Sequence, residues 1–396
     1  MNQFILYGKN PEYNLIPRLS EQDSGALSEL LLLAEQYCFS GNLWHAFLAW
    51  LLIQDENPYS LSCERRKKPD TGFNAFAEQD LEKIYELFFT SMPQLPEHFA
   101  APKREDQLAM TGKAASELAQ KLESSQNIRQ FIQNVTDFYT EKGVGIFSTN
   151  RAFSVDGGES VPVCHLLPIT FSDLWGYEMQ KQQLIENTEA FLAGKPANNV
   201  LLYGDSGAGK SASVKALLNR YAPDGLRVIE LYKHQFSALP RLTKTLRNRN
   251  YRFLIYMDDL SFEEFETDYK YLKALMEGGL EERPENILIY ATSNRRHLVR
   301  EKFSDKEERR DDLHSSDTVQ EKLSLVARFG VSIFFCAPDK KQFQNIVKTL
   351  AERHHVEMPE EELLLEANKW ELQHGGLSGR TAQQFIDYLC GKNENE

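Results

Sequence analysis

Hydrophobic residues recur every three or four positions through the first part of the chain. This spacing holds over residues 27–37, 43–53, 80–92 and 109–139. It places apolar side chains on one face of a helix, and Ser, Asn or Asp near the starts suits helix N-termini. We therefore expect a helical region joined by polar, proline-bearing connectors at 56–73 and 92–107. Trp44 and Trp50 fall on an apolar helix face, which indicates core packing rather than a ligand platform.

The period of the hydrophobic pattern changes after this region. Two short β-favouring runs, 146–155 and 161–167, flank Asp156-Gly157-Gly158 and predict a β-hairpin. Five later runs are apolar at nearly every position: 199–203, 226–231, 253–257, 287–291 and 331–336. Strands that are apolar on both faces and alternate with helices predict a doubly wound α/β domain with a parallel sheet.

The pattern returns to a helical spacing after Pro338 and keeps it until Leu389. Three glutamates, Glu360 to Glu362, open one of these helices, where negative charge is favourable. We expect this part to form a small helical lid and the last residues, 391–396, to be disordered.

Composition and charge narrow the choice of partners. Of the 396 residues, 41% are hydrophobic and 26% are charged, as in an ordinary globular protein. The net charge of -13 disfavours nucleic acid and anionic membranes, except where basic residues cluster. One stretch holds basic residues and no acid: Lys233, Arg241, Lys244, Arg247, Arg249 and Arg252. It is either a contact for a polyanion or, the simpler interpretation, the solvated face of a helix.

Cysteine usage and the N-terminus indicate the compartment. The five cysteines are scattered without a C-x-x-C pair, which indicates reduced thiols. The N-terminus lacks the basic and apolar regions of a secretory signal. The most apolar helical run, 43–53, is about half as long as a membrane span. These features predict a cytoplasmic protein with no membrane segment.

The strongest motif is a glycine-rich loop directly after the strand expected at 199–203. Its residues, which fit G-x-x-x-x-G-K-[ST], are Gly204, Asp205, Ser206, Gly207, Ala208, Gly209, Lys210 and Ser211. The glycines let successive N–H groups point at phosphates, and the following helix adds the positive end of its dipole. Lys210 is expected to reach the β and γ phosphates, and Ser211 to offer its hydroxyl to Mg²⁺. A chance glycine turn is disfavoured because strand, loop and helix stand in order.

Two carboxylates end the strand expected at 253–257. Asp258 is expected to bind Mg²⁺, and Asp259 to polarise the attacking water as a base. Asp259 is shorter than the glutamate often found at this position, so Glu263 and Glu264 are alternative bases. The simpler interpretation, a solvated acidic turn, is less fitting at this distance after a phosphate-binding loop.

Taken in order, these residues and four further segments resemble the AAA+ ATPases. The segment 171–177 (FSDLWGY) resembles the lining of the adenine pocket in that group, with Leu174, Trp175 and Gly176 as its contacts. The segment 287–294 resembles sensor 1 with Asn294 at its tip, and 323–330 resembles the arginine-finger box with Arg328. The turn 376–380 (GLSGR) resembles sensor 2 with Arg380.

The resemblance implies a role for each polar residue. Asn294 is expected to orient water near the γ phosphate and Arg380 to cover the phosphates from the lid. Arg328, presented by a neighbouring subunit, is expected to neutralise charge in the transition state. Singly, each has a simpler interpretation: Asn294 as a helix cap, Arg328 as a surface ion pair, Arg380 as part of its own helix. The pair Asp258-Asp259 in place of Asp-Glu also occurs in the replication-initiator branch of the group.

Over half of the chain, from about 167 to 389, is similar to a bacterial AAA+ family catalogued only as a domain of unknown function. The similarity rests on PANNVLL at 196–202, DDLSF at 258–262, ATSNRRHL at 291–298 and SGRT at 378–381. We expect four parts: an N-terminal helical domain at 1–142, a β-hairpin linker at 143–170, an AAA+ α/β nucleotide-binding domain at 171–337 and a helical lid at 338–391.

These features predict an ATPase that couples MgATP binding and hydrolysis to conformational change or assembly, with ATP and Mg²⁺ as cofactors. One alternative is an ATP-binding scaffold or switch with little turnover, and another is a DNA-associated, loader-like factor. A P-loop kinase is disfavoured because kinases need neither an arginine finger nor a lid arginine. A homo-oligomer with Arg328 acting in trans fits the resemblance, and the protein or nucleic-acid client stays open. Phe236 lies where ring-forming relatives place pore residues, but core packing is its simpler interpretation.

Overall fold

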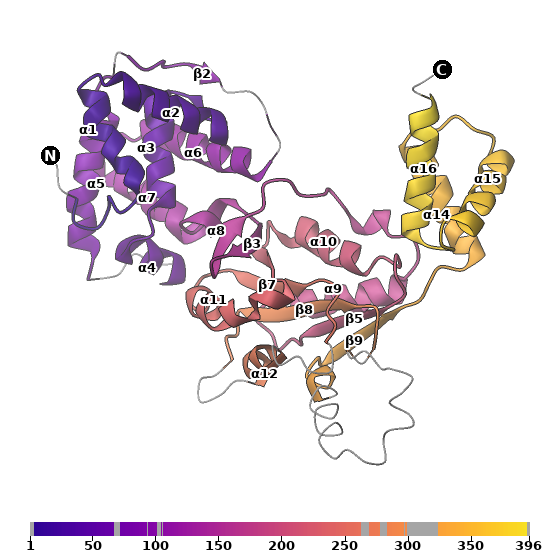
Figure 1. The fold of residues 1–396 in the computed structure, drawn as a ribbon. Helices are drawn as coiled ribbons and strands as arrows, with labels where there is room; N and C mark the ends of the chain where they lie inside the picture. Colours follow the sequence, from indigo (N-terminus) through magenta and orange to yellow (C-terminus); the bar gives the residue numbers. More distant parts are fainter. Residues whose placement is uncertain are drawn as a thin grey trace. The chain divides into compact units, whose positions relative to one another are not determined.

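The computed structural model describes residues 4–66, 72–92, 94–100, 104, 106–262, 269–277, 283–296, 298 and 324–393 (Figure 1). Glu263, Glu264 and Leu323 lie outside the described residues, as do 394–396. The expectation that 391–396 are disordered is wrong for 391–393, which belong to the last helix of the chain. Contacts divide the chain into two units. The first contains Met1–Ser154, Ser160–Leu166 and Thr245–Tyr251, and the second contains Val155–Glu159, Leu167–Lys244 and Arg252–Glu396.

The first unit is a helical bundle. Its helices are α1 (Leu15–Ser20), α2 (Ser24–Tyr37), α3 (Leu43–Gln54), α4 (Pro58–Arg66), α5 (Asn74–Phe88), α6 (Gln107–Glu123), α7 (Ile128–Glu141) and α8 (Ile146–Thr149), beside a 3-10 turn, η1 (Pro11–Asn14), and a two-stranded sheet of β1 (Ser40–Gly41) and β2 (Phe99–Ala100). Helix α3 buries ten of its 12 residues, so it forms the centre of this core. Trp44 and Trp50 are only 2% and 4% exposed, which confirms their core packing.

Two expectations for the first unit are wrong in detail. The stretch 109–139 is two helices, α6 and α7, because Asn127 caps a new helix by accepting the N–H of Gln130 at 3.0 Å. The connector expected at 56–73 contains helix α4. The side chain of Asn57 accepts the N–H groups of Tyr59 and Ser60 at 2.9 and 3.0 Å. Pro58 at the first position of that helix starts it rather than breaks it.

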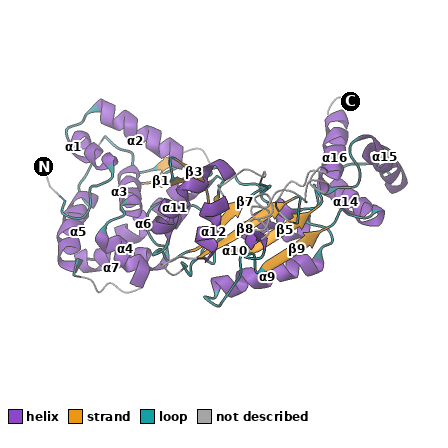
Figure 2. Cartoon of the chain, turned by 60° about the horizontal axis from the view of Figure 1, so that its bottom comes forward, coloured by secondary structure: helices purple, strands orange, loops and turns teal. Residues whose placement is uncertain are grey.

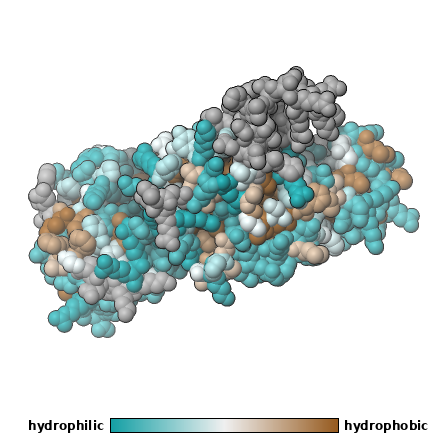
Figure 3. Space-filling model, turned by 90° about the horizontal axis from the view of Figure 1, so that it is seen from below, coloured by the Kyte–Doolittle hydropathy of each residue, from teal (hydrophilic) through white to brown (hydrophobic). Residues whose placement is uncertain are grey.

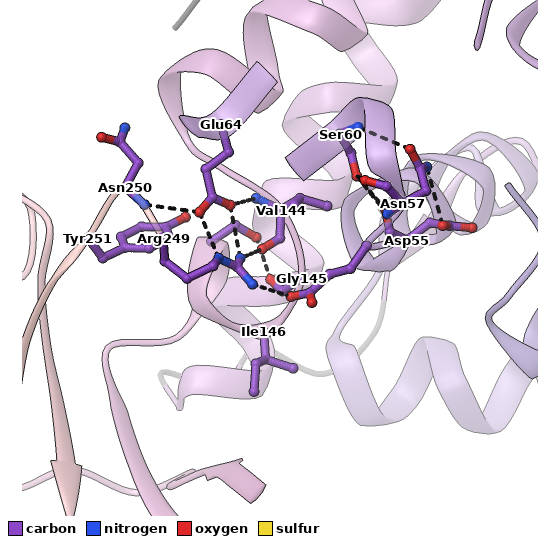
Figure 4. A network of polar contacts seen from close by, with 12 residues as sticks. Asp55, Asn57, Ser60, Glu64, Val144, Gly145, Ile146, Arg249, Asn250 and Tyr251 are labelled. Carbon is purple, nitrogen blue, oxygen red and sulfur yellow. Dashed lines mark hydrogen bonds and ion pairs between the residues drawn. The ribbon is translucent and has the colours of Figure 1, made fainter. Parts of the chain in front are cut away.

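The segment 245–251 completes the first unit although it follows α11 (Leu239–Leu246) in the sequence. Arg249 is enclosed there with a side chain 2% exposed, and it donates from Nε to Glu64 at 2.7 Å and from Nη1 to Glu56 at 2.7 Å (Figure 4). Glu64, 1% exposed, also accepts the N–H groups of Val144 and Asn250 at 3.0 and 3.1 Å. The buried charges are thus paired and hydrogen-bonded, as burial requires.

The expected hairpin exists with different limits. Its strands are β3 (Ala152–Asp156) and β4 (Glu159–Pro162), joined through Gly157 and Gly158. The expectation of a strand from 146 is wrong, because Ile146–Thr149 is a helical turn that starts at Gly145, with φ of 71°. The second strand also ends before residue 163.

The second unit contains the parallel sheet. Its parallel strands are β5 (Val200–Gly204), β6 (Leu226–Glu230), β7 (Arg252–Met257), β8 (Ile287–Ser293) and β9 (Val331–Phe335). The sheet order is β4-β3-β6-β7-β8-β5-β9, and all four pairs between β6 and β9 are parallel. All five strands expected from the sequence are therefore confirmed. The order reverses at β5, so the loops after β5 and β8 share one end of the sheet, where ligands of such folds bind.

Helices cover both faces of the sheet (Figure 1). They are α9 (Glu178–Leu192), α10 (Lys210–Tyr221), α11 and α12 (Tyr269–Glu277), with 3-10 turns η2 (Phe171–Asp173) and η3 (Lys233–Ala238). Helix α10 follows β5 on one face, and α12 lies on the opposite face (Figure 1). This arrangement follows from right-handed crossovers on a sheet whose order reverses.

A helical lid ends the described chain. It consists of α14 (Lys340–Arg353), α15 (Glu360–Gln373) and α16 (Gly379–Asn393), which pack around their own apolar core (Figure 2). The acidic helix start expected at Glu360 is confirmed. The doubly wound α/β fold with a C-terminal helical lid and an N-terminal helical part is therefore confirmed.

The surface drawn in Figure 3 is mostly hydrophilic, as expected for a chain with 26% charged residues. On the face drawn in Figure 3, hydrophilic residues prevail and hydrophobic residues form small, separate groups. Within the described parts of the chain, every helix is too short or too polar to cross a membrane.

Candidate functional site

The glycine-rich loop connects β5 to α10 in a conformation that needs glycine. Gly204, Gly207 and Gly209 have φ values of 134°, 73° and 92°, which side chains rarely allow. A Cβ added to Gly204 would lie 1.9 Å from the carbonyl oxygen of Phe335 on the neighbouring strand. Helix α10 starts at Lys210, so the loop ends at a helix N-terminus that attracts anions.

The ammonium group of Lys210 is folded into the loop. Its Nζ donates to the carbonyl oxygens of Gly204 and Asp205 at 2.8 and 2.7 Å, and to Oδ1 of Asn294 at 3.0 Å. These three acceptors occupy all its donors. Desolvation lowers the pKa of Lys210, although the carboxylates of Asp205, Asp259 and Asp258 act in the opposite direction.

Ser211 and Asp258 lie side by side at the end of the loop. The hydroxyl of Ser211 donates to Oδ1 of Asp258 at 2.7 Å. Desolvation raises the pKa of Asp258, but hydrogen bonds from Thr292 and Ser211 outweigh this effect and hold the pKa below its usual value. The carboxylate therefore favours its charged form.

These two oxygens fit Mg²⁺, which binds through one or two carboxylates together with substrate phosphates. Among the described residues no cluster of three or more His, Cys, Asp or Glu could hold a metal ion alone.

Asp259 and Asn294 form the next contact of the site. The side-chain amide of Asn294 donates to Oδ1 of Asp259 at 3.0 Å, while its oxygen accepts from Lys210. Asn294 therefore links the residue expected to bind phosphate to the residue expected to act as a base. Asp259 has φ of 50°, a left-handed backbone that Asp and Asn adopt more readily than other side chains.

Thr292 was missed from the sequence although it lies near the end of β8, two residues before Asn294. It is 1% exposed, donates its hydroxyl proton to Asp258 and accepts the N–H of Asp259 at 2.9 Å. The signal was a hydroxyl two residues before Asn294, on the same side of a strand that adjoins the carboxylates.

The lid contacts the loop through the turn at 378–380. The N–H of Gly379 donates to the carbonyl of Gly207 at 3.1 Å. A Cβ added to Gly207 would lie 2.8 Å from the Cβ of Ser378 and 3.6 Å from the Cβ of Arg380. Arg380 itself is exposed, at the start of α16. The sequence-predicted Arg380 is therefore brought beside the loop.

The segment before α9 lies at the other end of the loop. A Cβ on Gly209 would lie 3.3 Å from Leu174, whereas Trp175 is 43% exposed. A pocket of about 440 Å³ includes Leu174, Trp175 and Gly176, but its other lining residues come from α9, the end of α10 and the start of the same segment. An ion pair between Asp173 and Arg353 ties this segment to the lid.

Arg328 does not reach the loop within this chain. Its guanidinium donates to Glu277 of α12 and to the hydroxyl of Ser324 at 2.9 Å. The structure therefore brings together all the predicted polar site residues except Arg328.

The remaining predictions concern the basic stretch and Phe236. Phe236 is 1% exposed, so its interpretation as a core residue is confirmed. Arg241 pairs with Glu159, Arg252 donates to the carbonyl of Glu285 at 2.8 Å, and Arg249 is buried in the first unit. Neither a solvated helix face nor an open polyanion surface describes Arg249, because its charge is used inside the fold.

The sequence of the chain matches one protein family and parts of two other proteins. The model of the family described as "Protein of unknown function (DUF815)" matches residues 148–393. The 26S proteasome regulatory subunit 4 homolog of Dictyostelium discoideum is 30% identical over 124 residues, which cover 26% of this chain and 28% of that protein. The homolog of Encephalitozoon cuniculi is 29% identical over 117 residues, with 25% and 28% covered. The chain thus spans little more than a quarter of the length of these curated relatives.

Solved structures that resemble the chain do so distantly. A point mutant of Thermotoga maritima RuvB has a TM-score of 0.40 at 16% identity, covering 56% of this chain and 65% of that chain. The FIGL-1 AAA domain in complex with ADP has a TM-score of 0.40 at 17% identity, covering 57% and 75%. The relationship to the AAA+ ATPases expected from the sequence is confirmed by the parallel sheet, the loop geometry and the local sequence matches.

Proposed function

The chain belongs to the family described as "Protein of unknown function (DUF815)", and on that premise we propose that it binds MgATP and hydrolyses it to ADP and phosphate. The observation that carries this proposal is the set of contacts that joins Lys210, Ser211, Asp258 and Asn294 at one end of the sheet. Residues from three different strands and loops converge there on the N-terminus of α10. A purely structural role would not require a lysine held by carbonyl oxygens beside an exposed acidic pair.

Binding begins with the loop. The N–H groups at the start of α10 face the phosphates, and Lys210 exchanges its carbonyl partners for phosphate oxygens. Ser211 and Asp258 would hold Mg²⁺, which would supply positive charge to the β and γ phosphates. Arg380 closes over the phosphates from the lid turn, which already contacts Gly207. Leu174, which lies beside Gly209, and the neighbouring Trp175 would contact the base of the nucleotide.

Hydrolysis needs a water placed in line with the γ phosphate. The oxygen of this water attacks the γ phosphorus while Asp259 accepts a proton from the water. The bond between the γ phosphorus and the oxygen that bridges to the β phosphate breaks. Asn294 orients the water after Lys210 has turned to the phosphate. The amide has two N–H groups, and its oxygen is then free of Lys210, so Asn294 can bond the water while one N–H still holds Asp259.

The contact between Asn294 and Asp259 also supports a second candidate, an ATP-binding switch with little turnover. If the contact holds the short side chain of Asp259 away from the water when ATP is bound, the proposed base does not reach the proton of the water and hydrolysis is slow. This candidate shares the binding residues and differs in the rate of the chemical step.

The test measures binding and turnover separately. We expect Lys210→Ala to abolish ATP binding and Asp258→Ala to remove the dependence on Mg²⁺. Asp259→Asn should keep ATP affinity and lower kcat about 10²-fold to 10⁴-fold. Tight ATP binding without turnover in the unmodified chain would favour the switch. Phosphate transferred to an added small molecule instead of water would overturn both candidates.

A further inference from the structure

The hydroxyl of Thr292 forms hydrogen bonds with two acidic residues, Asp258 and Asp259. Its Oγ1 accepts the backbone N–H of Asp259 at 2.9 Å and donates to Oδ1 of Asp258. A hydroxyl has one proton, so an N–H bound to a lone pair leaves the proton free for a second partner. The two bonds therefore direct the proton of Thr292 toward Asp258. The side chain is 1% exposed, which keeps water from competing for either bond.

The end of β8 also shapes the turn that carries the carboxylates. The carbonyl of Thr292 accepts the N–H of Leu260 at 2.7 Å, and the hydroxyl of Ser293 donates to the carbonyl of Leu260 at 2.8 Å. Between these anchors Asp259 takes its left-handed φ of 50°. Residues with a Cβ rarely adopt this backbone conformation without such support.

The turn sends the two carboxylates to different partners. Asp258 faces Ser211 at 2.7 Å, where Mg²⁺ would bind, and Asp259 faces Asn294 at 3.0 Å, where water would attack. Thr292, Ser293 and Asn294, at and just after the end of β8, thus all bond to the segment 258–260 that follows β7. Thr292 is the one whose side chain bonds to both members of the acidic pair.

We propose that Thr292 is a positioning residue that holds Asp258 and Asp259 in the arrangement that binds MgATP. This inference rests on the proposed function and assigns a side chain that the motifs leave without a role. Loss of the hydroxyl frees the carboxylate of Asp258 to rotate away from Ser211 and frees the N–H of Asp259. The consequence falls on the metal-dependent part of nucleotide binding, since the hydroxyl of Thr292 donates to the carboxylate expected at the metal.

The test compares ATP affinity of the full chain in Mg²⁺ and in EDTA. Thr292→Val keeps the shape of the side chain and removes the hydroxyl, while Thr292→Ser keeps the hydroxyl. We expect Thr292→Val to lose about 10-fold to 100-fold of the affinity that Mg²⁺ adds, with affinity in EDTA unchanged. Thr292→Ser should keep the gain. If Thr292→Val does not fold, Thr292→Ala removes the same hydroxyl with less bulk.

Ser293→Ala is the matched control, because it removes a hydroxyl from the same turn without touching a carboxylate. We expect it to keep most of the gain from Mg²⁺, because the backbone bond from Leu260 to the carbonyl of Thr292 still supports the turn. An equal loss in Ser293→Ala and Thr292→Val would overturn the assignment, because the turn rather than the hydroxyl on Asp258 would then matter. A full gain in Thr292→Val would also overturn it, while leaving the proposed function intact.

Two further measurements separate this inference from the proposed function. If the unmodified chain gains no ATP affinity from Mg²⁺, the proposed function fails and the inference falls with it. In the nucleotide-free chain, hydrogen exchange of the peptide that contains 258–260 should be faster in Thr292→Val than in Thr292→Ser. Equal exchange rates in the two variants would contradict the proposal that the hydroxyl of Thr292 holds Asp258 and Asp259 in place.

Discussion

His45 lies in the helical unit with its ring packed on another ring. Its Nε2 is 2.9 Å from the carbonyl oxygen of Phe88, and the two ring centroids are 4.0 Å apart. Desolvation lowers the pKa of His45, although Glu123, the Phe88 carbonyl and Glu97 act in the opposite direction. Nδ1 is buried and makes no hydrogen bond within the described part of the chain. Protonation inside the fold is therefore unfavourable.

This burial predicts a pH dependence of stability. The unfolded histidine takes up a proton below about pH 6.5 while the folded one resists it, so stability is full above that pH and is lost as pH falls. We expect the melting temperature of the unmodified chain to fall more between about pH 7.5 and 5.5 than that of His45→Gln. Tryptophan fluorescence reports the transition, because Trp44 and Trp50 share this core. Parallel profiles for the two proteins would contradict the prediction.

At the scale of elements, the guanidinium of Arg249 holds the segment 245–251 in the helical unit, together with the N–H of Asn250 and the hydroxyl of Tyr251. Arg249 and Glu64 have side chains 2% and 1% exposed, and a second bond joins Arg249 Nη2 to Glu64 Oε2 at 2.9 Å. Removing one member of such a pair leaves the other charge buried without a partner. Loss of one partner therefore lowers stability mainly because the other charge stays buried and unpaired, rather than because the ion pair itself is strong.

We expect Arg249→Met to cost about 3–5 kcal/mol of stability, measured by urea unfolding. The double variant Arg249→Met/Glu64→Leu should recover part of the loss, because both buried charges are then gone. Arg241→Met is the control. Its pair with Glu159 is 62% and 71% exposed, and such pairs contribute at most about 1 kcal/mol. Similar losses in Arg249→Met and Arg241→Met would contradict the assignment.

For the whole molecule, Arg328 is the proposed site residue that lies away from the phosphate-binding loop of its own chain. Within one chain it pairs with Glu277, and the side chain keeps 22% of its surface exposed. We infer that an intersubunit contact would release it from Glu277 and present it to a neighbouring nucleotide. The site of one chain contains every other proposed polar group, so the missing group defines what assembly would add.

This inference predicts that ATPase activity per subunit rises with protein concentration. Arg328→Ala should abolish the rise and lower the plateau about 10³-fold, as loss of an arginine finger does. Arg241→Ala, with its exposed pair, should keep the rise. Activity that stays flat with concentration and survives Arg328→Ala would rule out action in trans. Light scattering with and without ATP records the assembly itself.

Much of the α/β domain follows from the sequence because its signals are local. Each strand is a short apolar run, and the glycines of the loop are dictated by the backbone that the loop itself must adopt. Asp258, Asn294 and Lys210 were identified because strand ends and a phosphate loop have fixed positions in such a chain. The limits of the helices and of the hairpin do not follow from the hydrophobic pattern, since a cap such as Asn57 or Asn127 resembles any polar residue of a connector until the N–H groups that it accepts are known.

The tertiary structure decided the rest. The sequence shows Arg249 only as one of several basic residues, and burial against Glu64 arises from residues 185 positions away. The only sequence signal for Thr292 is its place two residues before Asn294, and its importance comes from the neighbouring strand that places Asp258 and Asp259 against its hydroxyl. Periodicity and motif spacing record what a residue does for its own segment. The partners of a buried charge or hydroxyl lie on other segments, so only the folded chain specifies them.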